Sequence, residues 1–294
     1  MPIRIFQVDA FCRDLFSGNP AAVCPLEDWL PDEVMQKIAA ENNLAETAFF
    51  VREGVADGGG AHGGAERDGG AHGRGNRFHL RWFTPIVEVD LCGHATLASA
   101  HVLFEHLGFS YEKIVFSSRS GELMISREAG LLQLNFPPDT IRPVAITDAM
   151  RQWFSASPVE AYKGRSDYML VFDGEPTIEG LQADLAAIEK AKEARGVIVT
   201  AKGDEVDFVS RFFAPQSGIA EDPVTGSAHT TLTPYWSARL GKKELDAIQL
   251  SARLGFLHCR DLGDRIAISG AAKTYMEGLL YVSTSSGNPT RILR

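Results

Sequence analysis

The sequence predicts an α+β protein built from two similar domains, each a mainly antiparallel sheet or barrel wrapped around one central buried helix. Three blocks of sequence occur twice, in the same order and at a nearly constant offset: residues 81–85 and 211–215, residues 90–96 and 221–229, and residues 117–123 and 251–257. This repetition indicates an internal duplication, with a period too long for a solenoid. We therefore expect an N-terminal domain over residues 1–136, a C-terminal domain over residues 137–294 and one site between them. A C-terminal strand is expected to cross back to the first domain.

The first domain opens with strand patterns. Residues 3–11 alternate in polarity and are rich in β-branched residues, which predicts a strand. Residues 16–24 bring Gly, Asn and Pro together, which predicts a tight turn before an apolar strand. A helix is expected from Pro31 to Ile38, because proline suits a first helical turn and acidic residues follow it at the positive end of the dipole. Residues 44–51 resume a strand, and its apolar run contains a single carboxylate, Glu46.

Residues 54–77 are of low complexity, and the pentapeptide Gly-Gly-Ala-His-Gly occurs twice in them. Such a composition buries too little apolar surface to offset the entropy of ordering it, so we expect an expanded hairpin loop before a return strand at 78–83. His62 and His72 lie in this stretch. Glycine between them provides poor preorganisation for ligands, and we expect no metal site.

Each domain has one apolar segment that predicts its central helix. Residues 93–107 are apolar nearly all round, as in a buried helix rather than a surface one, and residues 230–240 form the second such segment. Pro137 and Pro138 mark the boundary between the domains. The remaining expected elements are strands at 113–118, 122–127, 131–136, 168–172, 196–200, 248–252, 256–260, 265–269 and 279–282, and an amphipathic helix at 178–191.

Composition and charge exclude several classes of protein. The formal net charge of −9 and the lack of a basic stripe disfavour a nucleic-acid partner, whose binding depends on clustered Lys and Arg. The four cysteines have no metal-ligand spacing, which suits a reducing compartment. No segment has the apolar length of a membrane span, and the N-terminus becomes polar too early for a signal peptide. We expect a cytoplasmic protein without a membrane partner.

The two central helices predict an anion site. If they begin at Gly93 and Gly226, each presents unpaired backbone N–H groups and the positive end of its dipole. Glycine also lets a ligand approach the backbone closely, and a cleft between domains is a common place for such a ligand. A small carboxylate is the expected guest. A simple close-packing contact remains the alternative explanation for each glycine.

Four motifs, in order along nearly the whole chain, carry a resemblance to a known family. They are Phe-Ser-Gly-Asn-Pro-Ala-Ala-Val at 16–23, Asn-Leu-Ala-Glu-Thr-Ala-Phe at 43–49, Leu-Cys-Gly-His-Ala-Thr at 91–96 and Glu-Asp-Pro-Val-Thr-Gly-Ser-Ala at 221–228. The chain resembles the phenazine-biosynthesis PhzF-like family, which has the two-domain diaminopimelate-epimerase-like fold. The resemblance implies a cofactor-free isomerase that acts on a small carboxylate-containing substrate by general acid/base catalysis. A homodimer is a candidate assembly.

The same resemblance implies a role for each matched residue. Glu46 corresponds to the acid/base, while Asp222 and His94 correspond to catalytic groups that bind and orient the substrate. The implied substrate-binding residues are Asn19, Gly93, Thr225, Gly226 and Ser227.

Each role has a plainer alternative. Glu46 could be an exposed strand residue, Asp222 before Pro223 could be an ordinary helix N-cap, and Ser227 could serve the same purpose. His94 could be a neutral structural histidine near a helix start.

Two rival functions stay open. Cys92 at a helix start could act as the base of a two-thiol epimerase or racemase, but the second copy has Thr225 and no cysteine nearby. The fold could also serve a non-catalytic binding protein, since fold does not determine function.

Overall fold

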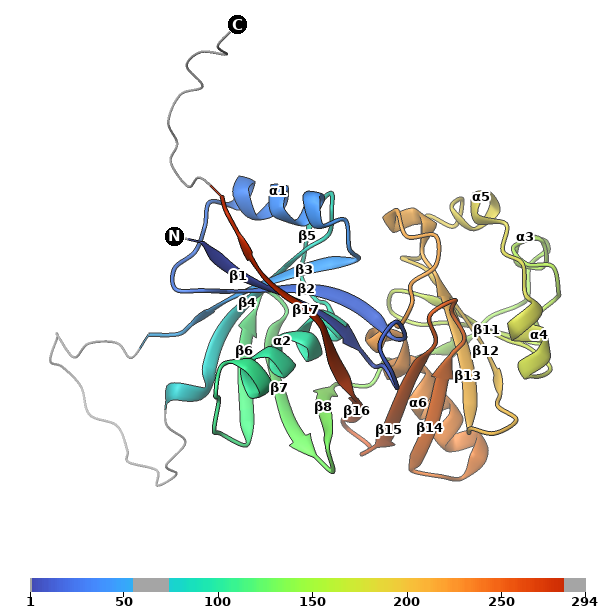
Figure 1. Ribbon diagram of the computed structural model, residues 1–294. Helices are drawn as coiled ribbons and strands as arrows, with labels where there is room; N and C mark the ends of the chain where they lie inside the picture. Colours follow the sequence, from blue (N-terminus) through green and yellow to red (C-terminus); the bar gives the residue numbers. More distant parts are fainter. Residues whose placement is uncertain (1, 55–73, 283–294) are drawn as a thin grey trace, which may run out of the picture.

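The computed structural model describes residues 2–54 and 74–282 (Figure 1). The first half contains β1 (Ile3–Ala10), β2 (Asn19–Leu26), α1 (Asp32–Asn42), β3 (Glu46–Arg52), β4 (Arg77–Phe83), β5 (Glu88–Val89), α2 (Gly93–His106), β6 (Lys113–Ser118), β7 (Gly121–Glu128) and β8 (Leu131–Phe136). The second half contains β9 (Arg142–Pro143), α3 (Asp148–Gln152), β10 (Glu160–Lys163), β11 (Tyr168–Val171), α4 (Glu175–Gly180), α5 (Leu185–Ile188), β12 (Val197–Lys202), β13 (Phe208–Phe213), α6 (Gly226–Leu240), β14 (Glu244–Gln249), β15 (Gly255–Asp261), β16 (Ile266–Gly270) and β17 (Ala272–Leu280). The predicted loop at 54–77 falls mostly outside the described residues.

The strands form one continuous, mixed and strongly curved sheet. Its hydrogen-bonded path runs from β17 through β1, β2, β3 and β4 to β6, β7 and β8, and then through β16, β15, β14, β13, β12 and β11 to β10 and β9. The halves are therefore joined where β8 pairs with β16. The last described strand, β17, pairs antiparallel with the first, β1, so it lies in the sheet of the first half.

Each half wraps its strands around one helix, which confirms the predicted α+β class (Figure 1). α2 packs against β1, β2, β3 and β8, and α6 packs against β14, β15 and β16. Nine residues of α2 are buried, including polar Ser99 and Thr96. These two hydroxyls donate to main-chain oxygens one turn earlier, so they need no partner outside the helix.

The repeated Arg-aromatic-Phe-x-Pro blocks perform the same task in each half. In β4, the Nε and Nη2 atoms of Arg81 donate to both carboxylate oxygens of Glu88, at 2.7 and 2.8 Å. In β13, the same two atoms of Arg211 donate to both oxygens of Glu221, at 2.7 and 2.9 Å. Both glutamates lie in the segment that leads to a central helix. A bidentate clamp thus fixes the approach to each helix start.

The prediction of one helix over residues 178–191 is wrong. The structure has two short helices there, α4 and α5, with an extended residue at Leu181 after Gly180. The Asp184 side chain accepts from the main-chain N–H of Ala187 and so starts a new helix. The cap at Asp184 therefore starts a separate helix in a segment whose apolar periodicity predicted a single one. The prediction also missed α3, β9 and β10, and it placed the starts of α6 and β17 too late.

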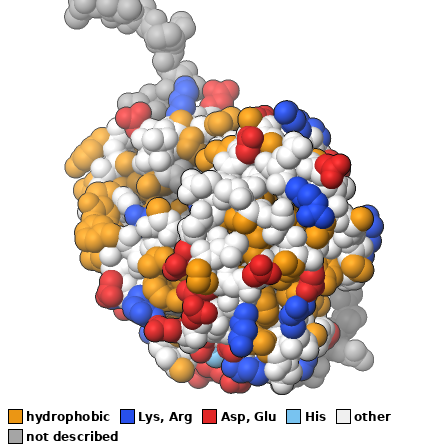
Figure 2. All heavy atoms as spheres, turned by 90° about the vertical axis from the view of Figure 1, so that its right-hand side faces the viewer, with side chains coloured by type: hydrophobic (Ala, Val, Ile, Leu, Met, Phe, Trp, Pro, Cys, Tyr) orange, Lys and Arg blue, Asp and Glu red, His pale blue; other side chains and the backbone are white. Residues whose placement is uncertain are grey.

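Figure 2 shows the face of the second half, where Lys and Arg side chains are interspersed with Asp and Glu rather than gathered into a stripe. In the described part of the chain, no helix is both long and apolar enough to span a membrane.

Candidate active site

The two central helices begin in contact with each other. α2 begins at Gly93 after Cys92, and α6 begins at Gly226 after Thr225. A Cβ atom built on either glycine would lie 3.6 Å from the Cα atom of the other. That distance is an ordinary van der Waals contact, so the helix starts touch but packing alone does not require glycine at either position. The contact leaves room for a ligand site, because neither capping residue uses its side chain to bind the first-turn N–H groups of its helix.

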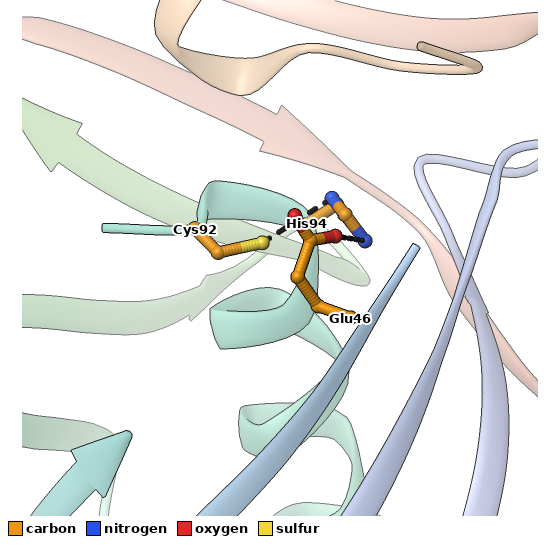
Figure 3. Close-up of side chains that lie close together, drawn as sticks. All are labelled: Glu46, Cys92 and His94. Atoms are coloured by element: carbon orange, nitrogen blue, oxygen red, sulfur yellow. Dashed lines mark hydrogen bonds and ion pairs between the residues drawn. The ribbon is translucent and has the colours of Figure 1, made fainter. Parts of the chain in front are cut away.

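Glu46 is the first residue of β3 and is only 8 % exposed, so the exposed-strand interpretation is wrong. Its carboxylate faces the ring of His94, the second residue of α2 (Figure 3). Glu46 Oε2 lies 3.1 Å from His94 Nε2. This approach has the distance of an ion pair without the angle of a hydrogen bond, and neither atom has a hydrogen-bond partner in the described part of the protein. Each of these two atoms is therefore available for a hydrogen bond, either with a ligand or, after a small change of angle, with the other.

The surroundings of His94 favour its charged form. Burial acts against an imidazolium, but the Cys92 sulfur and the Glu46 carboxylate outweigh it and raise the pKa of His94 well above its usual value. Burial also raises the pKa of the Cys92 thiol to about 11, with a further contribution from Glu46. The thiol is thus neutral near pH 7, so of the two groups that raise the pKa of His94 only the Glu46 carboxylate is charged there.

Asn19 joins the two halves at the site. It is fully buried at the start of β2, and its amide nitrogen lies within hydrogen-bond distance of three atoms. These are Asp222 Oδ1 at 2.8 Å, the main-chain oxygen of Val224 at 3.0 Å and His94 Nδ1 at 3.2 Å. An amide has two N–H groups, and the two oxygens accept them. Nδ1 of a protonated His94 carries its own hydrogen and cannot accept a third bond, so the contact to His94 is not a hydrogen bond in that state. Oδ1 of Asn19 has no partner among the described residues.

Asp222 is held by side chains rather than acting as a helix cap. The N-cap of α6 is Thr225, so the N-cap interpretation of Asp222 is wrong. Asp222 Oδ2 accepts from Thr225 Oγ1 at 2.6 Å, while Oδ1 accepts from Asn19. Its main-chain oxygen accepts from the amide of Gln249 at 2.8 Å, and Gln249 Oε1 accepts from the N–H of Thr225 at 2.8 Å.

Sequence reasoning missed Gln249, a fully buried residue at the end of β14. No motif surrounds it, and its partners lie more than twenty residues earlier in the chain. Its bridging position becomes visible only when β14 is placed beside the turn that holds Asp222. The amide then ties both ends of that turn to the sheet.

Burial raises the pKa of Asp222 to about 6, and the charge of Glu46 adds to this effect. His94 and the hydrogen bonds from Thr225 and Asn19 act in the opposite direction but are weaker in sum. Asp222 therefore changes its protonation near neutral pH. It can donate or accept a hydrogen bond to a ligand, depending on its state.

Replacing Asp222 by Asn should remove a pH-dependent loss of stability. Because the pKa is raised in the folded protein, the folded state binds more protons than the unfolded state between about pH 4 and pH 6, and the free energy of unfolding falls as pH rises through this window. As pH rises from about 4 to about 6, the free energy of unfolding of the wild-type protein should fall relative to that of Asp222→Asn. Below and above this window, the difference between the two proteins should not change with pH. Urea unfolding of both proteins from pH 3.5 to pH 8 (about half-unit steps) measures it. Parallel curves would show that Asp222 titrates normally.

Ser227 is the second residue of α6 and occupies the position that His94 occupies in α2. Its Oγ accepts from Nη2 of Arg195 at 3.0 Å. Arg195 was not identified in the sequence, because it precedes β12 and belongs to none of the repeated blocks. All eight residues named from the sequence therefore lie around the contact between the two helix starts.

One cluster in this site could be mistaken for a metal centre. The ligand atoms of Glu46, Cys92 and His94 lie within 4.8 Å of one another (Figure 3). His94, however, faces Glu46 with Nε2 and Cys92 with Nδ1, the latter at 3.5 Å from Sγ. Each ring nitrogen thus faces only one of the other two groups, and the Cys92 thiol is protonated near neutral pH, which disfavours an ion shared by all three side chains. The cluster fits proton transfer better than metal binding.

Comparison with known proteins agrees with this arrangement. The family described as "Phenazine biosynthesis-like protein" matches residues 8–278. An uncharacterized isomerase of Pseudomonas aeruginosa is 48 % identical, over 96 % of this chain and 100 % of its own length. The crystal structure of a PhzF-family phenazine biosynthesis protein from Enterococcus faecalis is 43 % identical, with a TM-score of 0.87 over 96 % of this chain and 100 % of that one.

A solved structure of much lower sequence identity has the same fold. A probable proline racemase of Agrobacterium radiobacter superimposes with a TM-score of 0.57 over 98 % of this chain and 94 % of its own, at 9 % identity. The architecture of two sheet-wrapped helices is thus the diaminopimelate-epimerase-like one. With the family match over nearly its whole length and the high identity to relatives, the chain belongs to the phenazine biosynthesis-like (PhzF) family.

Proposed function

We propose that this isomerase moves a proton between two carbon atoms of a small carboxylate-containing metabolite, using side chains alone as acid and base. The observation that carries the proposal is the buried Glu46–His94 pair, 3.1 Å apart, at the contact between the two helix starts. Buried ionisable groups without full hydrogen bonding are costly, and they concentrate at functional sites. Here they meet Asp222 from the other half through Asn19.

Glu46 is the acid/base in this proposal. Its carboxylate takes a proton from a carbon next to a carbonyl group or a diene, and the electron pair left behind shifts along the conjugated system. The resulting carboxylic acid then returns the proton to a different carbon, so the product is an isomer of the substrate and no atom is gained or lost. One group can perform both steps because it is regenerated in each cycle.

His94 and Asp222 hold and polarise the substrate. The imidazolium of His94 places a positive charge beside the Glu46 carboxylate and keeps it oriented. Asp222, with a pKa of about 6, donates to or accepts from a substrate hydroxyl or carbonyl group. Charge that develops on the substrate during proton transfer is stabilised by these fixed groups and by the first-turn N–H groups of α2 and α6.

The two-thiol alternative conflicts with the structure. Cys92 has a raised pKa, whereas a thiol base needs a lowered one, and the matching N-cap in α6 is Thr225. Replacing Cys92 by Ala should therefore leave the rate of proton transfer within about threefold of wild type, since no charge is lost. Exchange measurements on the purified variant test this, with the folded state checked by circular dichroism. A hundredfold loss would restore the thiol mechanism.

A screen for solvent exchange tests the proposed function itself. The protein is incubated in D₂O with small unsaturated or hydroxylated carboxylic acids, and mass spectrometry follows the incorporation of deuterium at carbon. We expect at least one acid to yield an isomer, which carries one deuterium when the proton on Glu46 exchanges with solvent before it is returned to carbon. Binding of acids with neither exchange nor isomerisation across the panel would favour the non-catalytic binding protein.

A further inference from the structure

Arg195 lies beside the start of α6, and the proposed proton transfer gives it no role. Its Nε and Nη2 atoms donate to the two carboxylate oxygens of Asp167, at 3.0 and 2.5 Å. Nη2 also donates to the hydroxyl of Ser227 at 3.0 Å. Asp167 is 6 % exposed, while the Arg195 side chain is 42 % exposed. The cation is anchored on a buried carboxylate and remains open on another side.

Further contacts fix the orientation of this guanidinium. Its carbon lies 5.2 Å from the centre of the Phe212 ring, and the main-chain N–H of Arg195 donates to the oxygen of Ser166 at 2.8 Å. A bidentate ion pair, an aromatic face and a fixed backbone together leave the side chain little rotational freedom. A preorganised cation of this kind loses little entropy when it binds a ligand.

The hydrogen-bond chemistry of the pair points to an acceptor that the protein does not supply. A guanidinium has only donors, so Ser227 Oγ must accept from Arg195, and the hydroxyl hydrogen is directed elsewhere. Among the described residues, neither this hydroxyl hydrogen nor Nη1 of Arg195 has an acceptor. Because Asp167 takes the edge formed by Nε and Nη2, the N–H that reaches Ser227 belongs to the edge that Nη1 shares. The Ser227 hydroxyl rotates about its Cβ–Oγ bond, so it can direct its hydrogen to the region that Nη1 faces.

This region adjoins the proposed reaction centre. Ser227 follows Gly226, which touches Gly93, and Gly93 precedes His94. The first half thus contributes the acid/base pair of Glu46 and His94, while the second half contributes the cation. A substrate between the two helix starts meets groups of different chemistry at its two ends.

We propose that Arg195 and Ser227 together bind the substrate's carboxylate, and that Arg195 is a specificity-determining residue that selects acids over their neutral amides. One carboxylate oxygen accepts from the Ser227 hydroxyl and the other from Nη1 of Arg195. The substrate is then oriented with its carboxylate toward the second half and its reacting carbons toward Glu46. The proposal rests on the function proposed above for the identity of the reaction, but the binding step can be measured without any turnover.

Benzoate and succinate, with benzamide and succinamide as neutral counterparts, are suitable probes. We expect both acids to shift the ¹H–¹⁵N resonances of the Ser227 amide and the Arg195 Nε–H group, and the amides to shift neither. Arg195→Gln should weaken benzoate binding at least about tenfold, as expected for the loss of a charge-assisted hydrogen bond. The matched control is Arg127→Gln, which removes another partly exposed arginine with an ion pair, to Glu105, and an aromatic contact, to Phe104. It should bind benzoate as wild type does.

Two further variants separate this proposal from folding and from the proposed function. Arg195→Gln leaves Asp167 buried and unpaired, so the double variant Asp167→Asn/Arg195→Gln restores neutrality and should show the same weak binding in a stable protein. Glu46→Gln should bind benzoate normally while losing proton exchange. The proposal is overturned if benzoate leaves both resonances of the wild-type protein unchanged, or if either Arg195 variant binds it as tightly as wild type. Failure of exchange alone, with this binding pattern intact, counts against the proposed function only.

Discussion

Replacing Glu46 by Gln should lower the rate of solvent deuterium incorporation by at least ~10²-fold, the usual cost of losing a general acid/base. Glutamine keeps the size of the side chain but cannot take up a proton from carbon. The affinity for a carboxylate probe should change little, because Glu46 lies on the His94 side of the site and not beside Ser227. Proton exchange with an acid found in the screen provides the measurement, and the effect should appear in kcat rather than in KM.

The matched control is Glu41→Gln, which makes the same chemical change at an exposed glutamate in α1, near the start of β3. It should exchange deuterium as fast as the wild type. Near-normal exchange by Glu46→Gln would remove this residue from the mechanism and leave Asp222 as the remaining carboxylate at the helix starts.

Replacing Asn19 by Ala should cost roughly 2–4 kcal/mol of stability, because it leaves one buried and one partly buried acceptor without this donor. The acceptors are Asp222 Oδ1 and the main-chain oxygen of Val224, both in the other half of the chain. Without the hydrogen bond from Asn19, which opposes the effect of burial, the pKa of Asp222 should also rise further. Urea unfolding monitored by tryptophan fluorescence at pH 7 measures the loss of stability.

Asn42→Ala provides the comparison for this large effect. The Asn42 amide makes one partly buried hydrogen bond, to Thr47 Oγ1 at 3.0 Å, within the first half. Its loss should cost about 1 kcal/mol. Equal losses for the two variants would mean that Asn19 is not a link between the halves but one polar contact among many.

Local signals in the sequence predicted much of this fold. The repeated blocks indicated two similar halves, and the apolar segments at 93–107 and 230–240 located both central helices, although α6 begins earlier, at Gly226. Strand alternation located β1, β6, β7 and β8 within a residue or two. These elements are predictable because their cause is local: residue spacing determines which face of a helix or strand is apolar. The periodicity failed at 178–191, where Asp184 caps a separate short helix.

The sequence by itself also identified the family and the residues to examine, since four short motifs lie in a characteristic order. Only the tertiary structure decided how those residues meet. It placed Asn19 between His94 and Asp222, Gln249 beneath the turn that holds Asp222, and Arg195 against Ser227. These contacts join residues that are far apart in the chain, and each depends on strands that pair across the whole sheet. A polar side chain with a distant partner leaves no periodic pattern around it, so burial and hydrogen bonding reveal its role only after the chain has folded.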